Sequence, residues 1–263
     1  MNSEYRNLEV VQDVGVLRIT LNRPDVHNAF NRELIDELHA VFGGVEVPGN
    51  GPRAVVLAGA GASFCAGADV GWMRASIEYS EEENIADALR MAHMLNSIDR
   101  CPVPVIARVH GVALGGGVGL VAACDIAIAA EGARFAFSEA KLGIAPAVIS
   151  TFVLPKIGRG NARALFFTAE RFGAERALRI GLIHEVVAMA ELDAAVERVI
   201  GEIRTSAPHA IAASKRLLAS VEGLDRDNAI QLTADTIAHL RTSAEGQAGL
   251  RAFIEERKAG WVE

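Results

Sequence analysis

The sequence predicts an α/β core that is followed by a helical C-terminal part. Short β-rich runs alternate with helical patterns in the first half of the chain, and from about Ile149 onward almost every periodic segment has helical spacing. Hydrophobic residues make up 51% of the 263 residues, so one large core can be buried. No internal repeat or low-complexity tract interrupts this order.

The first elements predict a hairpin and an amphipathic helix. Residues 8–13 and 16–21 are β-rich and are separated by a two-residue turn, which is typical of antiparallel strands. Pro24 ends the second strand because it has no N–H to donate. Apolar residues at helical spacing then predict a helix over 31–42, with Asn31 as a candidate N-cap.

The middle of the chain predicts a long helix, a short helix and four more strands. The long helix is expected over 80–98, where Ser80 is a candidate N-cap and three glutamates suit the positive end of the helix dipole. The short, wholly apolar helix is expected over 120–124. The strands are expected at 53–58, 104–109, 126–130 and 134–137.

The last hundred residues are predicted to be helical, apart from one strand at 183–187. Apolar residues at helical spacing indicate helices at 162–168, 174–180, 189–205, 208–220, 226–240 and 243–258.

The composition excludes several classes of protein. A formal net charge of -7 leaves no basic surplus to neutralise phosphates, so neither a nucleic-acid partner nor a membrane partner is expected. The least polar stretch, 109–130, is interrupted by His110, Asp125 and several glycines and is too short to span a bilayer. Three separated cysteines and scattered histidines predict neither a disulfide framework nor a metal site. The start of the chain lacks the pattern of a signal peptide, so a cytoplasmic location is expected.

Two glycine-containing turns follow apolar strands, at 66–69 (Ala-Gly-Ala-Asp) and 114–119 (Leu-Gly-Gly-Gly-Val-Gly). A strand that runs into a glycine turn and then a helix leaves free N–H groups, which suit an anion or a developing oxyanion. The spacing of a dinucleotide-binding loop, the Walker A motif and the GxSxG elbow of serine hydrolases are all absent. The turns therefore predict an oxyanion hole with two donors, or simply two tight turns.

Glu139 is the candidate acid–base residue. It follows the strand predicted at 134–137 and has small and apolar neighbours. Partial burial is expected to raise its pKa and make it a competent proton carrier. The alternative is a surface ion pair with Lys141 or Lys156.

Several stretches share their order and spacing with one known family. They are 22–24 with 28–29, 64–69, 110–129, 137–146, 174–187 and 253–258. Together they resemble the crotonase (enoyl-CoA hydratase/isomerase) superfamily. The resemblance implies a spiral core of ββα units over 1–200 and a C-terminal helical trimerisation region over 201–263. It also implies a homo-trimer or a hexamer of two trimers, and an acyl-CoA thioester as substrate. Coenzyme A is part of that substrate, so no separate cofactor is expected.

The resemblance also implies roles for individual residues. The N–H groups of Ala68 and Gly116 would form the oxyanion hole, and Glu139 would be the catalytic carboxyl group. From its position alone Asp69 is also a candidate N-cap, and Trp72 either lines an acyl pocket or packs in the core. The residues expected along the substrate or its coenzyme A moiety are Arg23, His27, Ala66, Asp69, Trp72, Gly115, Gly119, Arg257 and Lys258.

Two positions depart from the family pattern. Enoyl-CoA hydratases of the family typically use two glutamates; the second corresponds to Glu139, but the first falls at Gly119, which has no side chain. The glycine-rich turn after the second glutamate is also altered, to Ala-Pro-Ala-Val-Ile-Ser at 145–150. A narrower resemblance, to the methylglutaconyl-CoA hydratase-like branch, covers 69–74, 79–88, 115–125 and 145–150.

Several functions remain open on these grounds. Addition of water to a 2-enoyl-CoA is favoured by the narrower resemblance. Isomerisation of a 3-enoyl-CoA to a 2-enoyl-CoA needs a single carboxylate, so Gly119 fits it well. Thioester hydrolysis is a third reaction of the fold. A non-catalytic acyl-CoA binder is the remaining alternative, and the two intact glycine turns with Glu139 argue against it.

Overall fold

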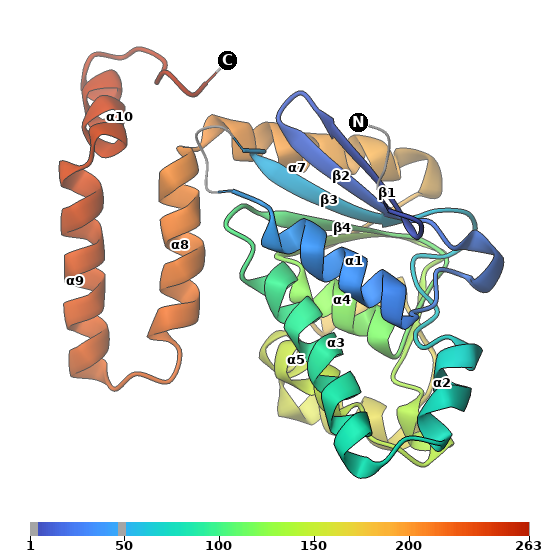
Figure 1. Cartoon of the computed structure of the whole chain (residues 1–263). Helices are drawn as coiled ribbons and strands as arrows, with labels where there is room; N and C mark the ends of the chain where they lie inside the picture. Colours follow the sequence, from blue (N-terminus) through green and yellow to red (C-terminus); the bar gives the residue numbers. More distant parts are fainter. Residues whose placement is uncertain (1–4, 47–50, 263) are drawn as a thin grey trace.

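A six-stranded sheet forms the centre of the molecule in the computed structural model, which describes residues 5–46 and 51–262 (Figure 1). The strand order is β1-β2-β3-β4-β6-β9; β1 and β2 form an antiparallel hairpin, and the other neighbours are parallel. Their bounds are Leu8–Asp13, Val16–Leu21, Ala54–Gly59, Val105–Val109, Ile126–Ala130 and Glu185–Val187. The strands predicted for these segments are confirmed to within two residues. The prediction that the chain starts without a signal peptide rests partly on residues 1–4, which lie outside the described residues.

A small second sheet brings the two chemically important segments together. It consists of β5 (Val112–Leu114), β7 (Arg134–Ala136) and β8 (Phe172–Gly173), in that order. Leu114 pairs with Ala136, so the chain leaves both strands at the same edge. One exit leads into the second glycine turn and the other leads to Glu139. The sequence predicted β7 but not β5 or β8, because strands this short show no clear alternation.

Helices cover both faces of the central sheet. One buried cluster joins the sheet to α1 (Arg32–Gly43), α3 (Glu81–Asp99), α4 (Gly116–Ala123) and α5 (Ala147–Thr168). A second cluster joins the opposite face to α7 (Leu192–Thr205). Figure 1 shows α7 on one side of the sheet and α1, α3 and α4 on the other. The predicted caps are confirmed, since Asn31 caps α1 and Ser80 forms a capping box with Glu83 at the start of α3.

Two helices begin earlier than the sequence predicted. The helix expected over 120–124 starts at Gly116, because close packing rather than helix propensity decides its first turn. A Cβ at Gly117 would lie 2.3 Å from the Cys65 carbonyl oxygen, so a glycine is required there. The helix expected over 162–168 is the second half of α5, which bends at Gly158, where φ is +70°.

The remaining helices are α2, which follows the first glycine turn, and α6, α8, α9 and α10 of the helical C-terminal part. Their bounds are Val70–Ile77 for α2, Ala174–Arg179 for α6, Pro208–Val221 for α8, Arg226–Thr242 for α9 and Ala244–Ile254 for α10. Figure 1 shows α8, α9 and α10 as an arm that stands away from the sheet. Within the part of the chain that the structure describes, no helix combines the length and the apolar character needed to cross a bilayer.

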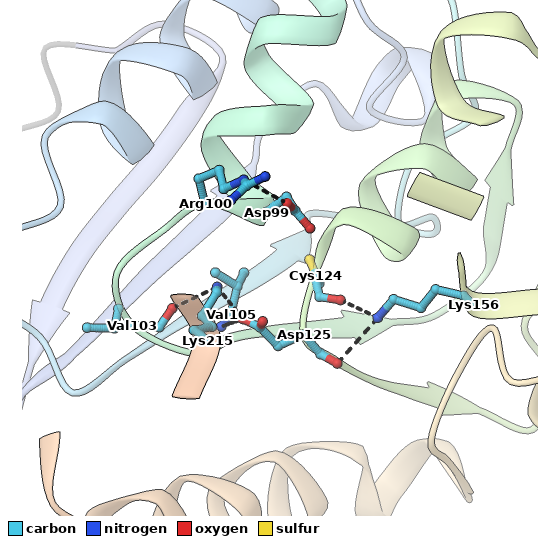
Figure 2. Close-up of polar contacts among 8 residues, drawn as sticks. All are labelled: Asp99, Arg100, Val103, Val105, Cys124, Asp125, Lys156 and Lys215. Atoms are coloured by element: carbon cyan, nitrogen blue, oxygen red, sulfur yellow. Dashed lines mark hydrogen bonds and ion pairs between the residues drawn. The ribbon is translucent and has the colours of Figure 1, made fainter. Parts of the chain in front are cut away.

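A polar cluster ties the arm to the core (Figure 2). Lys215 of α8 donates from Nζ to Asp125 Oδ2 at 2.6 Å, and the Val105 N–H donates to the same oxygen at 2.7 Å. Lys156 of α5 donates from Nζ to the carbonyl oxygen of Cys124 at 2.6 Å. Loss of solvation lowers the pKa of Lys156. The cluster therefore holds α8, the end of α4 and the start of β6 in one place.

Candidate active site

The two predicted glycine turns are in direct contact. The Cys65 N–H donates to the Val112 carbonyl oxygen (3.0 Å), and the Leu114 N–H donates to the Cys65 carbonyl oxygen (3.0 Å). Gly67 has a φ of +91°, and a Cβ there would lie 2.7 Å from the Leu114 oxygen and 3.8 Å from the Gly116 nitrogen. Only glycine permits so close an approach. The residue types of both turns therefore follow from their packing against each other.

Some N–H groups at this junction are left open, and they include those of the two predicted donors. The amides on either side of Ala68 are engaged with the chain, because Phe30 N–H donates to the Gly67 oxygen (2.7 Å) and Asp69 N–H donates to the Phe30 oxygen (2.8 Å). Gly115 N–H donates to the Ala136 oxygen (2.8 Å). In contrast, the N–H groups of Ala68 and Gly116 have no hydrogen-bond partner within residues 5–46 and 51–262. The Gly116 N–H is open because the first turn of a helix offers it no acceptor.

Glu139 lies beside this junction. It is the first residue of a 3-10 turn, Glu139–Leu142, which begins three residues after the end of β7. A Cβ at Gly115 would lie 3.2 Å from Glu139 Oε1, so the carboxylate faces the start of α4. Its Oε2 is buried and has no hydrogen-bond partner in the described structure. Burial raises the pKa of this carboxyl above its ordinary value, as the sequence predicted.

The ion pair considered as an alternative for Glu139 is not formed. Lys156 donates instead to the Cys124 carbonyl oxygen, at the far end of α4. Lys141 has no ion pair to Glu139 within the described structure. A carboxyl group that is half-buried, has no ion pair and has a raised pKa is well suited to transfer protons near neutral pH.

The space beside Gly119 is filled by Ile149. A Cβ at position 119 would lie 2.4 Å from Ile149 Cγ2 and 3.5 Å from Leu95 Cδ1. Ile149 is buried and belongs to the altered segment 145–150, which forms the start of α5. The two departures from the family pattern are therefore in contact with each other. Gly119 has no side chain, and the Ile149 side chain fills the space that a side chain at position 119 would occupy. Among the described residues, Glu139 is the carboxylate that lies beside Gly115 at the start of α4.

Arg23, His27 and Asp69 support the first glycine turn. The Gly71 N–H donates to Asp69 Oδ1 (2.6 Å), which confirms the predicted N-cap of α2. Arg23 donates from Nη2 to Asp69 Oδ2 (2.9 Å). Burial acts to raise the pKa of Asp69, but the Gly71 N–H and the Arg23 guanidinium outweigh it and the pKa is lowered. The Ala66 N–H donates to the His27 carbonyl oxygen at 2.9 Å, which ties the turn to that segment.

Trp72 and the C-terminal basic residues occupy different regions. Trp72 is half-buried and donates from Nε1 to Asp87 Oδ2 at 2.7 Å, so it both packs on the core and makes a specific polar contact. Arg257 and Lys258 follow α10 at the end of the arm, and Arg257 pairs with Glu255. Figure 1 shows α10, which these two residues follow, at the opposite side of the molecule from α2.

Sequence reasoning missed Ile149 and Asp87. Ile149 lies in a segment that was recognised as unusual, but its contact with Gly119 spans the sequence. Asp87 had a readable signal, since it lies one helical turn before Met91 on the apolar face of the helix predicted over 80–98. A carboxylate at such a position requires an explanation. Among the described residues, no group of three or more His, Cys, Asp or Glu side chains is arranged to hold a metal ion.

Comparison with known proteins identifies the family. The sequence profile described as enoyl-CoA hydratase/isomerase matches residues 12–263. The chain is 34% identical to the short-chain-enoyl-CoA hydratase of Clostridium acetobutylicum, with 97% of each chain covered. It is 32% identical to the crotonyl-CoA hydratase of Syntrophomonas wolfei, with 98% of each chain covered.

Solved structures agree with this result. An enoyl-CoA hydratase from Shewanella pealeana aligns with a TM-score of 0.94 and 39% identity over 98% of this chain and 97% of that one. Pseudomonas aeruginosa AtuE aligns with a TM-score of 0.94 and 37% identity over 98% of this chain and 100% of that one. The α/β fold expected from the crotonase resemblance is thereby confirmed, and the chain belongs to the enoyl-CoA hydratase/isomerase family.

Proposed function

We propose that this protein is an enoyl-CoA hydratase in which Ala68 and Gly116 hold the thioester oxygen and Glu139 moves the proton. The observation that supports the proposal is a pair of open N–H groups at the contact between the two glycine turns, with a half-buried carboxylate beside the start of α4 that has no ion pair in the described structure. The names of full-length relatives support the reaction, since they include a short-chain-enoyl-CoA hydratase and a crotonyl-CoA hydratase.

The reaction follows from these groups. Two N–H donors polarise the thioester C=O, and water adds to the β-carbon as its proton passes to the Glu139 carboxylate. The resulting enolate places its negative charge on the thioester oxygen, where each donor is worth about 3–4 kcal/mol by analogy with measured oxyanion holes. Glu139 then returns the proton to the α-carbon, which completes the addition of one water. A well-placed acid–base residue contributes about 10²–10⁴-fold.

Isomerisation of a 3-enoyl-CoA is the second candidate. It is favoured by Ile149, which occupies the space beside Gly119 and leaves Glu139 as the carboxylate on that face of α4. In this reaction Glu139 removes a proton from the α-carbon and returns it to the γ-carbon through the same enolate. No ordered water is required, so one carboxylate is sufficient.

The acyl group is proposed to be short and branched, like 3-methylglutaconyl. This rests on the narrower motif resemblance and not on a contact in the site. The coenzyme A moiety is proposed to lie along Arg23, His27 and Ala66, close to the first glycine turn.

Assembly into trimers or hexamers through 201–263 is proposed as well. The arm exposes large apolar side chains, as expected of a surface covered by another subunit; they include Leu218, Ile230, Phe253 and Ile254. A neighbouring subunit would then bring its Arg257 and Lys258 to the coenzyme A phosphates. Gel filtration with light scattering gives the oligomeric state directly.

Mass spectrometry in water labelled with oxygen-18 tests the reaction. Purified protein is incubated with crotonyl-CoA, 3-hexenoyl-CoA and 3-methylglutaconyl-CoA, and a hydratase product carries one labelled water. An isomerase product from 3-hexenoyl-CoA keeps the substrate mass and changes only its double-bond position. If neither product forms from any of the three thioesters, both candidate reactions are rejected.

A further inference from the structure

Asp87 is a buried carboxylate outside the acid–base group described above. Its side chain projects from α3, and the residue is 6% exposed. One oxygen, Oδ1, is buried without a hydrogen-bond partner in the described structure. The nearest cation, the Arg32 guanidinium, lies 3.7 Å from Oδ1 and is mostly exposed, which makes the ion pair a loose one. Because a buried carboxylate is costly to desolvate, its retention requires a specific use.

Asp87 makes a short hydrogen bond with Trp72. The indole Nε1 donates to Oδ2 at 2.7 Å, which is the short distance expected of a hydrogen bond to a charged acceptor. Trp72 lies on α2, four residues after the oxyanion donor Ala68, and Asp69 fixes the start of that helix. The bond therefore connects the segment that follows one oxyanion donor to helix α3.

Helix α3 in turn packs against the other donor. Met91 lies one turn after Asp87, and its Cε would be 2.6 Å from a Cβ at Gly116. Leu95, one turn further, lies against Gly119 in the same way. These contacts place α3 alongside α4, with Asp87 one turn before the residue that touches the Gly116 donor. The Trp72–Asp87 bond thus closes a bridge between α2 and α3 next to the start of α4.

We propose that the Trp72 indole forms one wall of the pocket for the acyl chain, next to the oxyanion hole. Asp87 is then a positioning residue, because its hydrogen bond fixes the orientation of this indole. An indole hydrogen-bonded to a buried carboxylate cannot rotate freely, so the wall limits the length of acyl chain that fits. Release of the indole removes this limit. The proposal rests on the proposed function, because it assigns a wall to the acyl group of that substrate.

Tryptophan emission tests whether Trp72 meets the acyl group. The chain has two tryptophans, so Trp72 is the remaining emitter in a Trp261→Phe variant. We expect butyryl-CoA to shift its emission saturably, whereas coenzyme A alone does not. An emission unchanged by butyryl-CoA would overturn the proposal. Because butyryl-CoA has no double bond to hydrate, this titration gives its result even if the hydration assay fails.

A double-mutant cycle tests whether Asp87 acts through Trp72. The quantity measured is the ratio of kcat/KM for crotonyl-CoA to kcat/KM for 2-decenoyl-CoA. Asp87→Leu and Trp72→Phe are each expected to lower this ratio about 10-fold, the usual effect of losing a charged hydrogen bond. The double variant is expected to match either single one, because both remove the same contact. Independent effects that multiply would contradict the proposal.

Two further variants separate positioning from a general loss of structure. Asp87→Asn keeps an oxygen that accepts the indole N–H, and it should retain most of the selectivity. Asp36→Asn is the matched control, since Asp36 is an exposed residue of α1 that pairs with Arg90 of α3 at 2.8 Å. It should leave the ratio unchanged. If Asp87→Asn loses as much selectivity as Asp87→Leu in folded protein, the positioning role is wrong.

Discussion

The two ends of α4 differ in whether their backbone polar groups are hydrogen-bonded within the protein. At the first turn, the Gly116 N–H is left open; of the adjoining glycines, Gly117 packs against the Cys65 backbone and Gly115 faces the Glu139 carboxylate. At the last turn, the Cys124 carbonyl oxygen accepts from Lys156, and the adjacent Asp125 carboxylate accepts from Lys215 and the Val105 N–H (Figure 2). The polar groups at the last turn are hydrogen-bonded within the protein, whereas the Gly116 N–H at the first turn is left open for the proposed thioester oxygen.

The difference matches the electrostatics of a helix. The C-terminal end carries partial negative charge, which a lysine ammonium compensates. The N-terminal end carries partial positive charge, which suits an oxygen that becomes negative during the reaction. A fixed C-terminal end keeps the open N-terminal end in place, since α4 is short and buried over its length. Substitutions at the two ends should therefore have separable effects on activity and stability.

The largest expected effect is on activity at the open end. Glu139→Gln should lower kcat about 10²–10⁴-fold, because an amide cannot carry the proton. Steady-state hydration assays measure the loss, and circular dichroism verifies the fold. Glu131→Gln, at an exposed position before β7, is the control and should keep full activity. An active Glu139→Gln protein would remove this residue from the mechanism.

The next effect concerns stability at the saturated end. Lys215→Met should lower the free energy of unfolding by about 3 kcal/mol, because it leaves the Asp125 charge without its cation. This is the lower end of the range for a broken buried pair, since 28% of the Asp125 side chain is exposed. Urea titration measures the loss. Protein that remains folded should keep its kcat, and a fall in kcat as large as that of Glu139→Gln would show that the two ends are not separable.

A smaller effect is expected from the contact between Gly119 and Ile149. Gly119→Ala should cost about 1–3 kcal/mol of stability, because the added Cβ would lie 2.4 Å from Ile149 Cγ2. The same substitution in an Ile149→Ala protein should cost almost nothing. Gly132→Ala, where the added Cβ meets no atom within 4 Å, is the control. Equal costs in both backgrounds would mean that Ile149 does not fill this space.

The pH dependence sharpens the comparison further. Burial raises the pKa of Glu139, so the folded state binds its proton more tightly than the unfolded state. The stability that this proton contributes is complete below the unfolded pKa and is lost as pH rises through the folded pKa. Activity should move the opposite way, because the reaction requires the carboxylate. Glu139→Gln should therefore abolish this loss of stability, which urea titrations measure as the pH rises above about 4.3, the ordinary pKa of a glutamate.

The sequence was sufficient for the fold, and it also singled out the residues proposed to act at the open end. Strands and helices with clear periodicity were predicted to within a few residues, and the glycine turns were recognised because glycine itself marks a close backbone approach. The start of α4 was missed for the same reason, since glycines argue against a helix unless packing requires them. Strands β5 and β8 were too short to show alternation.

Contacts between distant segments were the part that the sequence did not reveal. Gly119 and the altered segment 145–150 were both noted, but only the packing of α5 against α4 shows that Ile149 fills the missing place. The Trp72–Asp87 bond joins two helices whose relative placement depends on the whole core. Lys156 was considered as a partner for Glu139 and instead holds the opposite end of α4.

A crystal structure of the Glu139→Gln protein with crotonyl-CoA bound tests the central claim most directly. The thioester oxygen should lie about 2.7–3.1 Å from the backbone nitrogens of both Ala68 and Gly116, with the side-chain amide introduced at position 139 beside the α-carbon. A thioester oxygen bound elsewhere, or either N–H turned towards a protein acceptor, would contradict the account.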